Sequence, residues 1–408
     1  MSAGGPADSP VVEGHGLRVL MIGPFPRDRT RPGGGVESVT SNLIHGMAAL
    51  SGPEFQVITP CLGLDRMRRE TLANGDVTFV PLRPGLAGWR RDLHGRLMAE
   101  ARRRDVDLVH VQAAASVAAR MPGALLTVHG SAERDAFRTH VGPGRYLRAG
   151  TLLALEGAPR RAARRAIVTS TRATTPEIDG GSVRSWRWRR AWNIPNPIDP
   201  IFYGPASDTG RGDPTLFLCL GRITPLKDVA GAIRAFGPVA ATSSAGLLVA
   251  GDGLDTAYGR FCQDLVSNLG LRRSVTFLGG QTVRQSAALL REVGTLVLFS
   301  RQENAPMVVA EALAAGPAVV ATSVGEVPEL LRGLPGCHLV PVADEAALTD
   351  RLLASCVAEP AEAAGRRRLW AQRFRPETVA AQTLAVYTEL LSGRATAARG
   401  IAQHQESP

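Results

Sequence analysis

Residues 295–316 read TLVLFSRQENAPMVVAEALAAG, and their order predicts a short buried strand, a loop and a helix. Asn304 or Ala305 can cap this helix, and Pro306 fits its first turn. Gly316 fits the position just past its end. In a parallel sheet such a helix begins at the crevice beyond the carboxyl ends of the strands. Its unpaired amides and its dipole favour an anion, so the stretch predicts an α/β fold with an anion site.

Two glutamates flank the start of this predicted helix. Glu303 lies in the loop before it, and Glu311 lies about 7 Å past its start at the ~1.5 Å rise per residue. Carboxylates so placed would straddle a nucleotide sugar, one accepting hydrogen bonds from sugar hydroxyls and the other from ribose hydroxyls. The alternatives are that Glu311 is a solvated helix residue and that Glu303 only complements the helix dipole.

Lysine is almost absent from this chain. Among 47 lysine and arginine residues, Lys227 is the single lysine. It follows Arg222 by five residues, just past the aliphatic run 215–220 that predicts another strand. A compact ammonium suits one phosphate oxygen in a tight loop, whereas a planar guanidinium suits two acceptors at once. The two residues therefore predict a pyrophosphate clamp at a strand-to-helix turn; the alternative is a surface lysine retained by chance.

Short aliphatic runs alternate with helical stretches in two successive series, which predicts two doubly wound, Rossmann-like parallel sheets. The first series has predicted strands at 17–22, 55–59, 108–111, 125–128 and 167–170, with helices at 36–50, 89–104 and 146–164. The second has strands at 215–220, 247–250, 275–278, 295–299, 318–321 and 338–340, and closes with helices at 346–357, 362–374 and 376–391.

The proline-dense segment 193–200 separates the two series and fits an interdomain linker, because proline cannot continue a helix or a central strand. The predicted organisation has five parts. They are a disordered tail at 1–16, an N-terminal acceptor-binding domain at 17–195, a C-terminal donor-binding domain at 196–375, a helix at 376–392 that crosses back toward the N-terminal domain, and a disordered tail at 393–408.

The amino-acid composition indicates how the protein packs, which compartment it occupies and what charge its partner carries. Hydrophobic residues make up 44% of the chain and suit two packed cores, yet no apolar stretch approaches the ~20 residues that span a bilayer. The first residues do not match a secretory signal. Five cysteines without CxxC spacing favour reduced thiols, so we expect a cytoplasmic protein. The net charge of +10 predicts an anionic partner, which charge alone does not identify.

The pair Glu303 and Glu311, followed by Ala-Leu-Ala-Ala-Gly, resembles the Glu-x7-Glu signature of retaining glycosyltransferase family 4, whose members have the GT-B fold. The resemblance covers nearly the whole chain from Leu17 onward. It implies transfer of a sugar from a nucleoside-diphosphate donor to an acceptor hydroxyl, with retention at the anomeric carbon. The further matching motifs are Gly33-Gly-Gly-Val-Glu37, Gly221-Arg-x4-Lys-Asp228, Val249-Ala-Gly-Asp-Gly253, Phe277-Leu-Gly279 and Gly325-Glu-Val-Pro-Glu329.

The resemblance also implies roles for individual residues. Arg222 and Lys227 would bind the donor diphosphate and stabilise the leaving group. Glu303 would contact the sugar hydroxyls, and His129, at the end of a predicted strand, would meet the sugar near the reacting centre; a purely structural histidine is the alternative. The other donor-binding residues would be Glu311 at the ribose, Gly34, Gly35, Gly251, Asn304, Ala305, Met307 and Val308, and the acceptor would contact Gly33 and Glu133.

We expect no metal cofactor, because arginine, lysine and a helix dipole supply the positive charge that the leaving group needs. Asp105-Val-Asp107 matches a metal-binding pattern of another glycosyltransferase fold. It precedes the predicted strand 108–111, however, and so belongs at the amino edge of the sheet, away from the crevice.

The remaining expectations concern partners. The arginine-rich stretches 145–165 and 186–190 would suit an anionic membrane surface, at about 1 kcal/mol per well-placed arginine, or else form an ordinary amphipathic helix and a packed strand.

We expect a saccharide or lipid-linked acceptor in bacterial surface polysaccharide synthesis, with a small-molecule or natural-product acceptor as the alternative. A basic nucleic-acid-binding protein is the alternative from another class. We expect no nucleic acid partner, because the arginines lie on separate predicted helices instead of forming one stripe.

Overall fold

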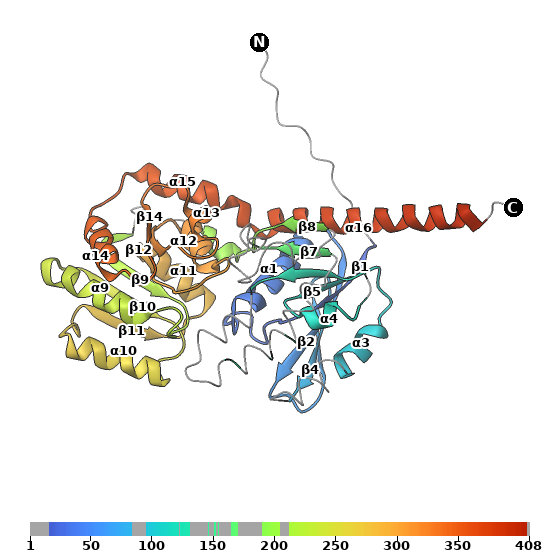
Figure 1. The fold of residues 1–408 in the computed structure, drawn as a ribbon, viewed down its shortest axis with the longest axis horizontal. Helices are drawn as coiled ribbons and strands as arrows, with labels where there is room; N and C mark the ends of the chain where they lie inside the picture. Colours follow the sequence, from blue (N-terminus) through green and yellow to red (C-terminus); the bar gives the residue numbers. More distant parts are fainter. Residues whose placement is uncertain are drawn as a thin grey trace, which may run out of the picture.

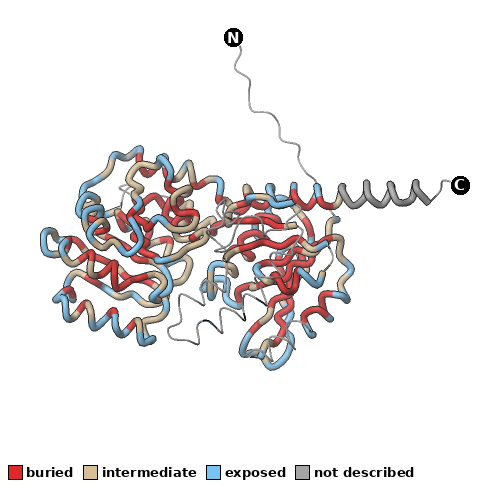
Figure 2. Tube along the Cα trace, viewed as in Figure 1, coloured by how far each residue is buried: buried red, intermediate tan, exposed pale blue. Residues whose placement is uncertain are grey.

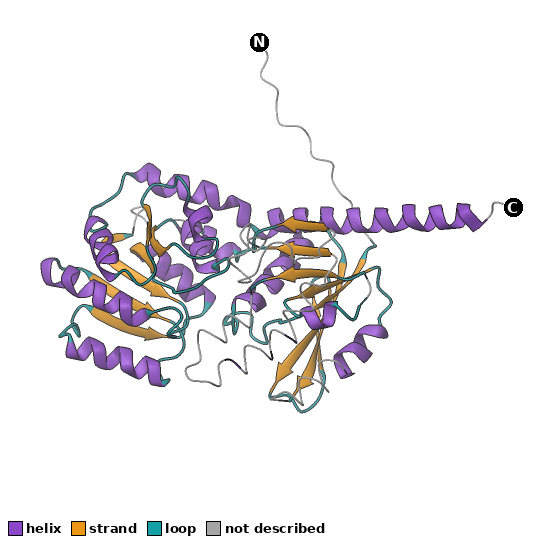
Figure 3. Cartoon of the chain, viewed as in Figure 1, coloured by secondary structure: helices purple, strands orange, loops and turns teal. Residues whose placement is uncertain are grey.

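The computed structural model describes residues 16–83, 95–121, 123–130, 146, 151, 154, 165–169, 190–204 and 212–405. Each half of the chain forms a mostly parallel α/β sheet that carries helices on its faces (Figures 1 and 3). The structure therefore has the predicted GT-B architecture. Residues 1–15 of the predicted first tail lie outside the described residues, as do nearly all of the stretch 145–165 and most of 186–190.

The first sheet has the strand order β3-β4-β2-β1-β5-β6-β7-β8, and every pair is parallel except β3 with β4. The order reverses direction at β1, which lies between β2 and β5, so a crevice opens beyond the carboxyl end of β1. The strands are β1 (Arg18–Ile22), β2 (Glu54–Leu62), β3 (Arg68–Leu72), β4 (Gly75–Leu82), β5 (Leu108–Gln112), β6 (Leu125–Val128), β7 (Arg165–Val168) and β8 (Arg190–Asn193).

The second sheet has the order β11-β10-β9-β12-β13-β14 and is parallel throughout. Its reversal point lies between β9 and β12, which are hydrogen-bonded neighbours. The loops that follow these two strands therefore leave the sheet side by side. The strands are β9 (Asp213–Leu220), β10 (Gly246–Ala250), β11 (Val275–Gly279), β12 (Val293–Leu298), β13 (Ala318–Thr322) and β14 (Cys337–Val340).

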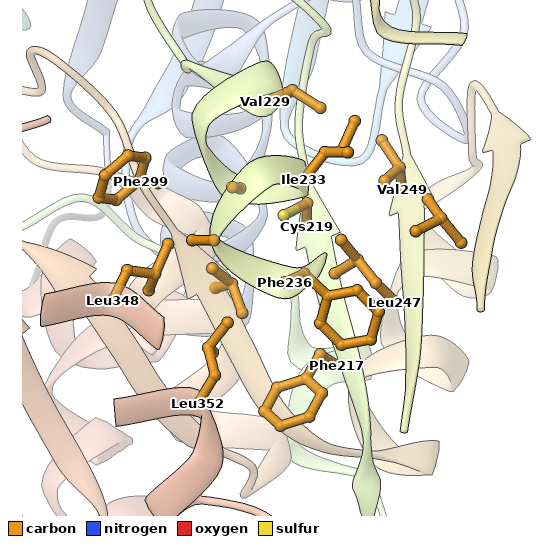
Figure 4. Packing of buried hydrophobic residues seen from close by; sticks show 14 of the residues in the cluster. Phe217, Cys219, Val229, Ile233, Phe236, Leu247, Val249, Phe299, Leu348 and Leu352 are labelled. Carbon is orange, nitrogen blue, oxygen red and sulfur yellow. The ribbon is translucent and has the colours of Figure 1, made fainter. Parts of the chain in front are cut away.

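Helices cover both sheets, and most residues of the sheet strands are buried (Figure 2). In the second half Ile233 and Phe236 of α9 face the sheet beside Phe217, whose ring meets that of Phe236 edge-on at 5.9 Å (Figure 4). The helices are α1 (Gly35–Ala49), α3 (Met98–Arg102), α4 (Ala115–Ala118), α9 (Val229–Thr242), α10 (Ala257–Asn268), α11 (Val283–Glu292), α12 (Met307–Ala315), α13 (Val327–Leu331), α14 (Glu345–Ala354), α15 (Ala361–Ala371) and α16 (Pro376–Gln405), with short 3-10 helices η5 (Pro200–Tyr203) and η6 (Gln372–Phe374).

The last helix, α16, leaves the second half and packs against α1 of the first half (Figure 1). Its residues Val379, Leu384 and Tyr387 belong to the core of the first sheet. The approach is close, because a Cβ added to Gly46 of α1 would lie 2.1 Å from the carbonyl oxygen of Pro376. The helix continues to Gln405, past residue 392, where we expected a tail to begin.

Four elements of the first half were not predicted: the two strands of the β3–β4 hairpin, α4 and β8. The strand β3 is a largely exposed, charged edge strand without an apolar run, whereas β4 has a buried run at 77–81 that the prediction missed. A predicted helix also differs in extent. The helix predicted at 89–104 includes α3 (Met98–Arg102), and residues 84–94 lie outside the described residues. None of the described helices is long and apolar enough to cross a bilayer.

Candidate active site

A cavity of about 860 Å³ lies between the carboxyl edges of the two sheets. Thirteen of the fourteen predicted site residues line it; the other, Glu133, lies outside the described residues. The lining residues from the first half are His129, Gly33, Gly34 and Gly35, and those from the second half are Arg222, Lys227, Gly251, Glu303, Asn304, Ala305, Met307, Val308 and Glu311.

Lys227 and Glu303 form an ion pair at the centre of this cavity. The Nζ atom of Lys227 lies 2.5 Å from Oε1 of Glu303, which also accepts a hydrogen bond from the Ser300 hydroxyl at 2.7 Å. The side chains are 28% and 10% exposed, so both are reachable from the cavity but poorly hydrated. A cation and a carboxylate thus lie next to each other on the wall of the cavity.

A second ion pair ties together the two loops that carry these residues. The Asp228 carboxylate accepts hydrogen bonds from Nε and Nη2 of Arg301 at 2.9 and 2.8 Å, and the Arg301 amide donates to Leu226 O at 2.8 Å. Asp228 is only 5% exposed and has left-handed backbone angles, φ 46° and ψ 46°. It also caps α9, accepting from the Gly231 amide at 3.3 Å. Asp228 therefore fixes where the Lys227 loop turns into helix.

Replacements of Asp228 should separate its backbone role from its charge. Asp228→Ala should lower the free energy of unfolding by roughly 2–4 kcal/mol, because it loses a helix cap and replaces a residue that tolerates the left-handed region by one that tolerates it less well. Asp228→Asn keeps the cap and tolerates this conformation, so it should cost under about 1 kcal/mol. Urea denaturation measures both; equal losses would show that the ion pair with Arg301 dominates instead.

Helix α12 begins at Met307 and presents its N-terminus to the cavity. Pro306 precedes the helix in an extended conformation and no side chain caps it, so the prediction that Asn304 or Ala305 caps α12 is wrong. The Asn304 side chain has another partner instead, since its Nδ2 donates to the carbonyl oxygen of His129 in the opposite half at 2.6 Å. The first amides of the helix are thereby left for an anion.

The far end of α12 is closed by two arginines of α15. Gly316 adopts φ 115°, as predicted for the residue that ends the helix. Arg367 donates twice to the carbonyl oxygen of Gly316, at 2.7 and 3.0 Å, and is only 2% exposed. Arg368 donates to the carbonyl oxygen of Ala315 at 3.0 Å. These cations complement the negative end of the dipole whose positive end faces the cavity.

Glu311 lies in the second turn of α12. Burial raises its pKa from the ordinary value of 4.5 to about 7, and the negative charge of Asp199 adds to the shift. The carboxyl is therefore partly protonated near neutral pH and can both donate to and accept from a hydroxyl pair.

Glu311→Gln should raise the melting temperature more at pH 8 than at pH 5. A carboxyl whose pKa rises on folding makes the native state bind more protons than the unfolded state. Its contribution to stability is therefore complete below the unfolded value of 4.5 and is lost as the pH rises through about 7. Glutamine has no proton to lose in this range, so the variant keeps its stability as the pH rises. Thermal unfolding of both proteins at both pH values tests this, and a pH-independent difference would contradict the raised pKa.

His129 follows β6 and lies at the boundary between the halves. Burial lowers the pKa of its imidazole to about 4, and the side-chain amide of nearby Asn196 opposes this only in part. The ring is therefore neutral at physiological pH. Its Nε2 lies 2.6 Å from Oε1 of Gln112.

The predicted glycines belong to two loops. Gly34 precedes α1 and Gly35 begins it, where a Cβ on Gly35 would touch the sulfur of Met307 across the cavity. Gly251 follows β10 with φ 147°, and a Cβ there would lie 1.9 Å from the carbonyl oxygen of Gly221. Only a glycine at position 251 lets the loop after β10 approach the loop after β9 so closely.

Contacts across the mouth of the cavity were not predicted. Arg31 of the β1–α1 loop pairs with Asp252 of the β10–α10 loop at 2.7 Å, and the Val283 amide donates to Thr30 O at 3.0 Å. A Cβ on Gly280 would lie 2.0 Å from Asp252 Oδ1, so this pair depends on a missing side chain. Asp252 lies within a recognised motif, but nothing in the sequence marks Arg31 as its partner.

The described residues contain no group of three or more His, Cys, Asp or Glu residues arranged to hold a metal ion. Asp105 and Asp107 both accept hydrogen bonds from Arg18, at the start of β1. The pair thus lies at the amino edge of the first sheet, as predicted.

Comparison with known families gives two matches. Residues 33–176 match the family described as Glycosyltransferase Family 4, and residues 214–356 match the one described as Glycosyl transferases group 1. A curated relative, N-acetyl-alpha-D-glucosaminyl L-malate synthase of Bacillus anthracis, is 27% identical over 181 residues, or 43% of this chain. The match spans 46% of that relative, somewhat under half its length.

Two solved structures are similar to this chain over their whole length. Sucrose-phosphate synthase from Thermosynechococcus elongatus superposes with a TM-score of 0.74 at 19% identity, covering 92% of this chain and 100% of that one. HepE of Anabaena, in complex with UDP and glucose, gives 0.68 at 19% identity, covering 91% and 100%. At such identities the similarity shows a shared fold.

Proposed function

Because the chain belongs to the group 1, family 4 glycosyltransferases with a GT-B fold, we propose that it moves a sugar from a nucleoside diphosphate to an acceptor hydroxyl with retention at the anomeric carbon. The observation that carries the proposal is the Lys227–Glu303 pair, which lies before the N-terminus of α12 in a cavity lined by both halves. The HepE complex with UDP and glucose supports a UDP-sugar as the first donor to test.

In the proposed reaction, negative charge develops on the diphosphate as the bond between the sugar and the phosphate breaks. Arg222 and Lys227 line the cavity together with the N-terminus of α12, and in this proposal they supply the donors that stabilise this charge. Glu303 orients the sugar through its hydroxyls. The acceptor hydroxyl attacks from the face that the phosphate leaves, and a phosphate oxygen takes its proton. We propose that these cations make a divalent metal unnecessary.

We also propose that residues 17–195 and 196–375 act as acceptor and donor domains that close about the segment 195–200. Closure would expel water and limit hydrolysis of the donor. The contacts across the cavity support this, since the ion pair of Arg31 with Asp252 and the hydrogen bond from Asn304 to His129 can form only when the halves approach.

For the acceptor we propose a saccharide or a lipid-linked saccharide, bound on the first half beside Gly33, with a natural product as the alternative. If the acceptor is lipid-linked, the protein should bind anionic membranes peripherally. Flotation with liposomes that contain or lack anionic lipid tests this. Equal recovery with both would argue against membrane docking.

The proposed activity is tested by incubating the full chain with a panel of nucleoside-diphosphate sugars, with and without EDTA. We expect one UDP-sugar to raise the melting temperature and to release UDP in the presence of acceptor, with no loss in EDTA. Anomeric configuration of the product is read by NMR. An inverted product, or a requirement for added magnesium, would contradict the corresponding part of the proposal.

A further inference from the structure

His129 is the cavity end of a buried polar cluster that reaches the C-terminal helix. Beyond the 2.6 Å contact of His129 with Gln112, the Gln112 Nε2 atom faces His110 Nε2 at 3.4 Å. His110 Nε2 lies 2.6 Å from the Thr127 hydroxyl, and His110 Nδ1 lies 2.7 Å from the hydroxyl of Tyr387 on α16. Gln112, His110 and Tyr387 are at most 1% exposed and Thr127 is 4% exposed.

The chemistry of these atoms assigns the protons. An amide nitrogen only donates, so His110 Nε2 is the acceptor toward Gln112, and the Thr127 hydroxyl must donate to the same atom. The single proton of neutral His110 then lies on Nδ1, where it donates to the Tyr387 oxygen. The Gln112 nitrogen also faces the sulfur of Met21, another acceptor, at 3.5 Å. The amide therefore turns its carbonyl oxygen to His129. A carbonyl oxygen only accepts, so His129 Nε2 carries a proton.

Packing alone does not account for this cluster. Burying polar groups costs free energy unless they are fully hydrogen-bonded, and apolar residues would fill the same positions in the sheet without that cost. The polar set is continuous, and it ends at a residue that lines the cavity.

We propose that Gln112 is a positioning residue that fixes His129 as the neutral Nε2–H tautomer, so that Nδ1 remains the ring's acceptor for a substrate hydroxyl. His110, Thr127 and Tyr387 hold the Gln112 amide in the required orientation. Only the use of Nδ1 by a substrate rests on the proposed glycosyl transfer; the tautomer is a property of the ligand-free protein.

The tautomer is measured by NMR of the full chain with ¹⁵N-labelled histidine. The chain has eight histidines, and His129→Gln identifies the signals of interest. We expect a protonated Nε2 and an unprotonated Nδ1. Gln112→Met, which removes the acceptor at similar volume, should move both signals toward the average of the two tautomers. Gln112→Glu keeps an acceptor oxygen and should restore the wild-type pattern.

Activity gives a second readout. Gln112→Met should lower kcat about 10-fold, in the range found for residues that orient functional histidines, with the Kd for UDP unchanged and partial recovery in Gln112→Glu. If the tautomer is as expected but no nucleotide sugar is turned over, the proposed function fails and the positioning inference stands.

Tyr387→Phe tests the far end of the cluster, even if the Gln112 variants do not fold. It should shift the signals of His110 and, through Gln112, those of His129. Thr383→Val is the matched control, since Thr383 is a buried hydroxyl on the same helix that bonds only to Val379 O. A wild-type proton on His129 Nδ1, or His129 signals unchanged in both Gln112→Met and Tyr387→Phe, would overturn the proposal.

Discussion

Lys227→Ala should lower kcat/KM by about 10²–10³, the usual loss when one preorganised donor to a developing anion is removed. Lys227 pairs with Glu303 in the cavity. Since we propose that its ammonium also binds the diphosphate, its removal should weaken binding of UDP. The measurements are steady-state kinetics with the best UDP-sugar and calorimetry with UDP. Unchanged kinetics would exclude Lys227 as a ligand of the diphosphate.

A stability control is needed, because Lys227→Ala removes the cation paired with Glu303, a side chain that is 10% exposed in the intact pair and keeps the hydrogen bond from Ser300. An uncompensated charge of this kind destabilises the fold. The double variant Lys227→Ala/Glu303→Gln removes that charge. We expect it to recover the melting temperature but not the activity, which separates loss of fold from loss of catalysis.

Glu303→Gln should also lower kcat by about 10²–10³, since a neutral amide replaces the carboxylate that we propose orients the sugar in the transition state. The expected effect on UDP is opposite to that of Lys227→Ala. Without its carboxylate partner the ammonium is free to bind phosphate, so the affinity for UDP should hold or increase.

The control for Glu303→Gln is Ser300→Ala. It removes the second hydrogen bond to the same carboxylate oxygen and leaves the charge in place. We expect a loss of kcat under about 10-fold. A Glu303→Gln protein that binds UDP 10-fold more weakly would show that Glu303 contacts the nucleotide and not the sugar.

Local sequence patterns predicted both sheets of the fold. Aliphatic runs located every strand of the second sheet, because parallel strands are buried on both faces. In the first sheet they missed β4 and β8, and also β3, whose charged residues Arg68 and Glu70 pair with each other at an exposed edge. The start of α12 was placed one residue early, because Asn304 bonds across the cavity to the other half, and no local capping rule includes such a contact.

The candidate site was predicted where loops follow adjacent strands. Lys227 and Glu303 lie 76 residues apart, yet β9 and β12 are neighbours, so strand order alone brings them together. Their roles remain a proposal. Gln112 and Arg31 could not have been identified in this way, because their importance lies in partners whose positions depend on how α16 and the second half dock.

The two arginines at the C-terminal end of α12 also define how small an autonomous second half can be. The family match in that half ends at residue 356, whereas Arg367 and Arg368 lie on α15, which begins at 361. A fragment that ends at residue 356 would lack the arginine donors to the carbonyl oxygens of Ala315 and Gly316. It would also remove Phe374 from the apolar cluster beneath α12. Any excised version of this half should therefore retain the chain through Phe374.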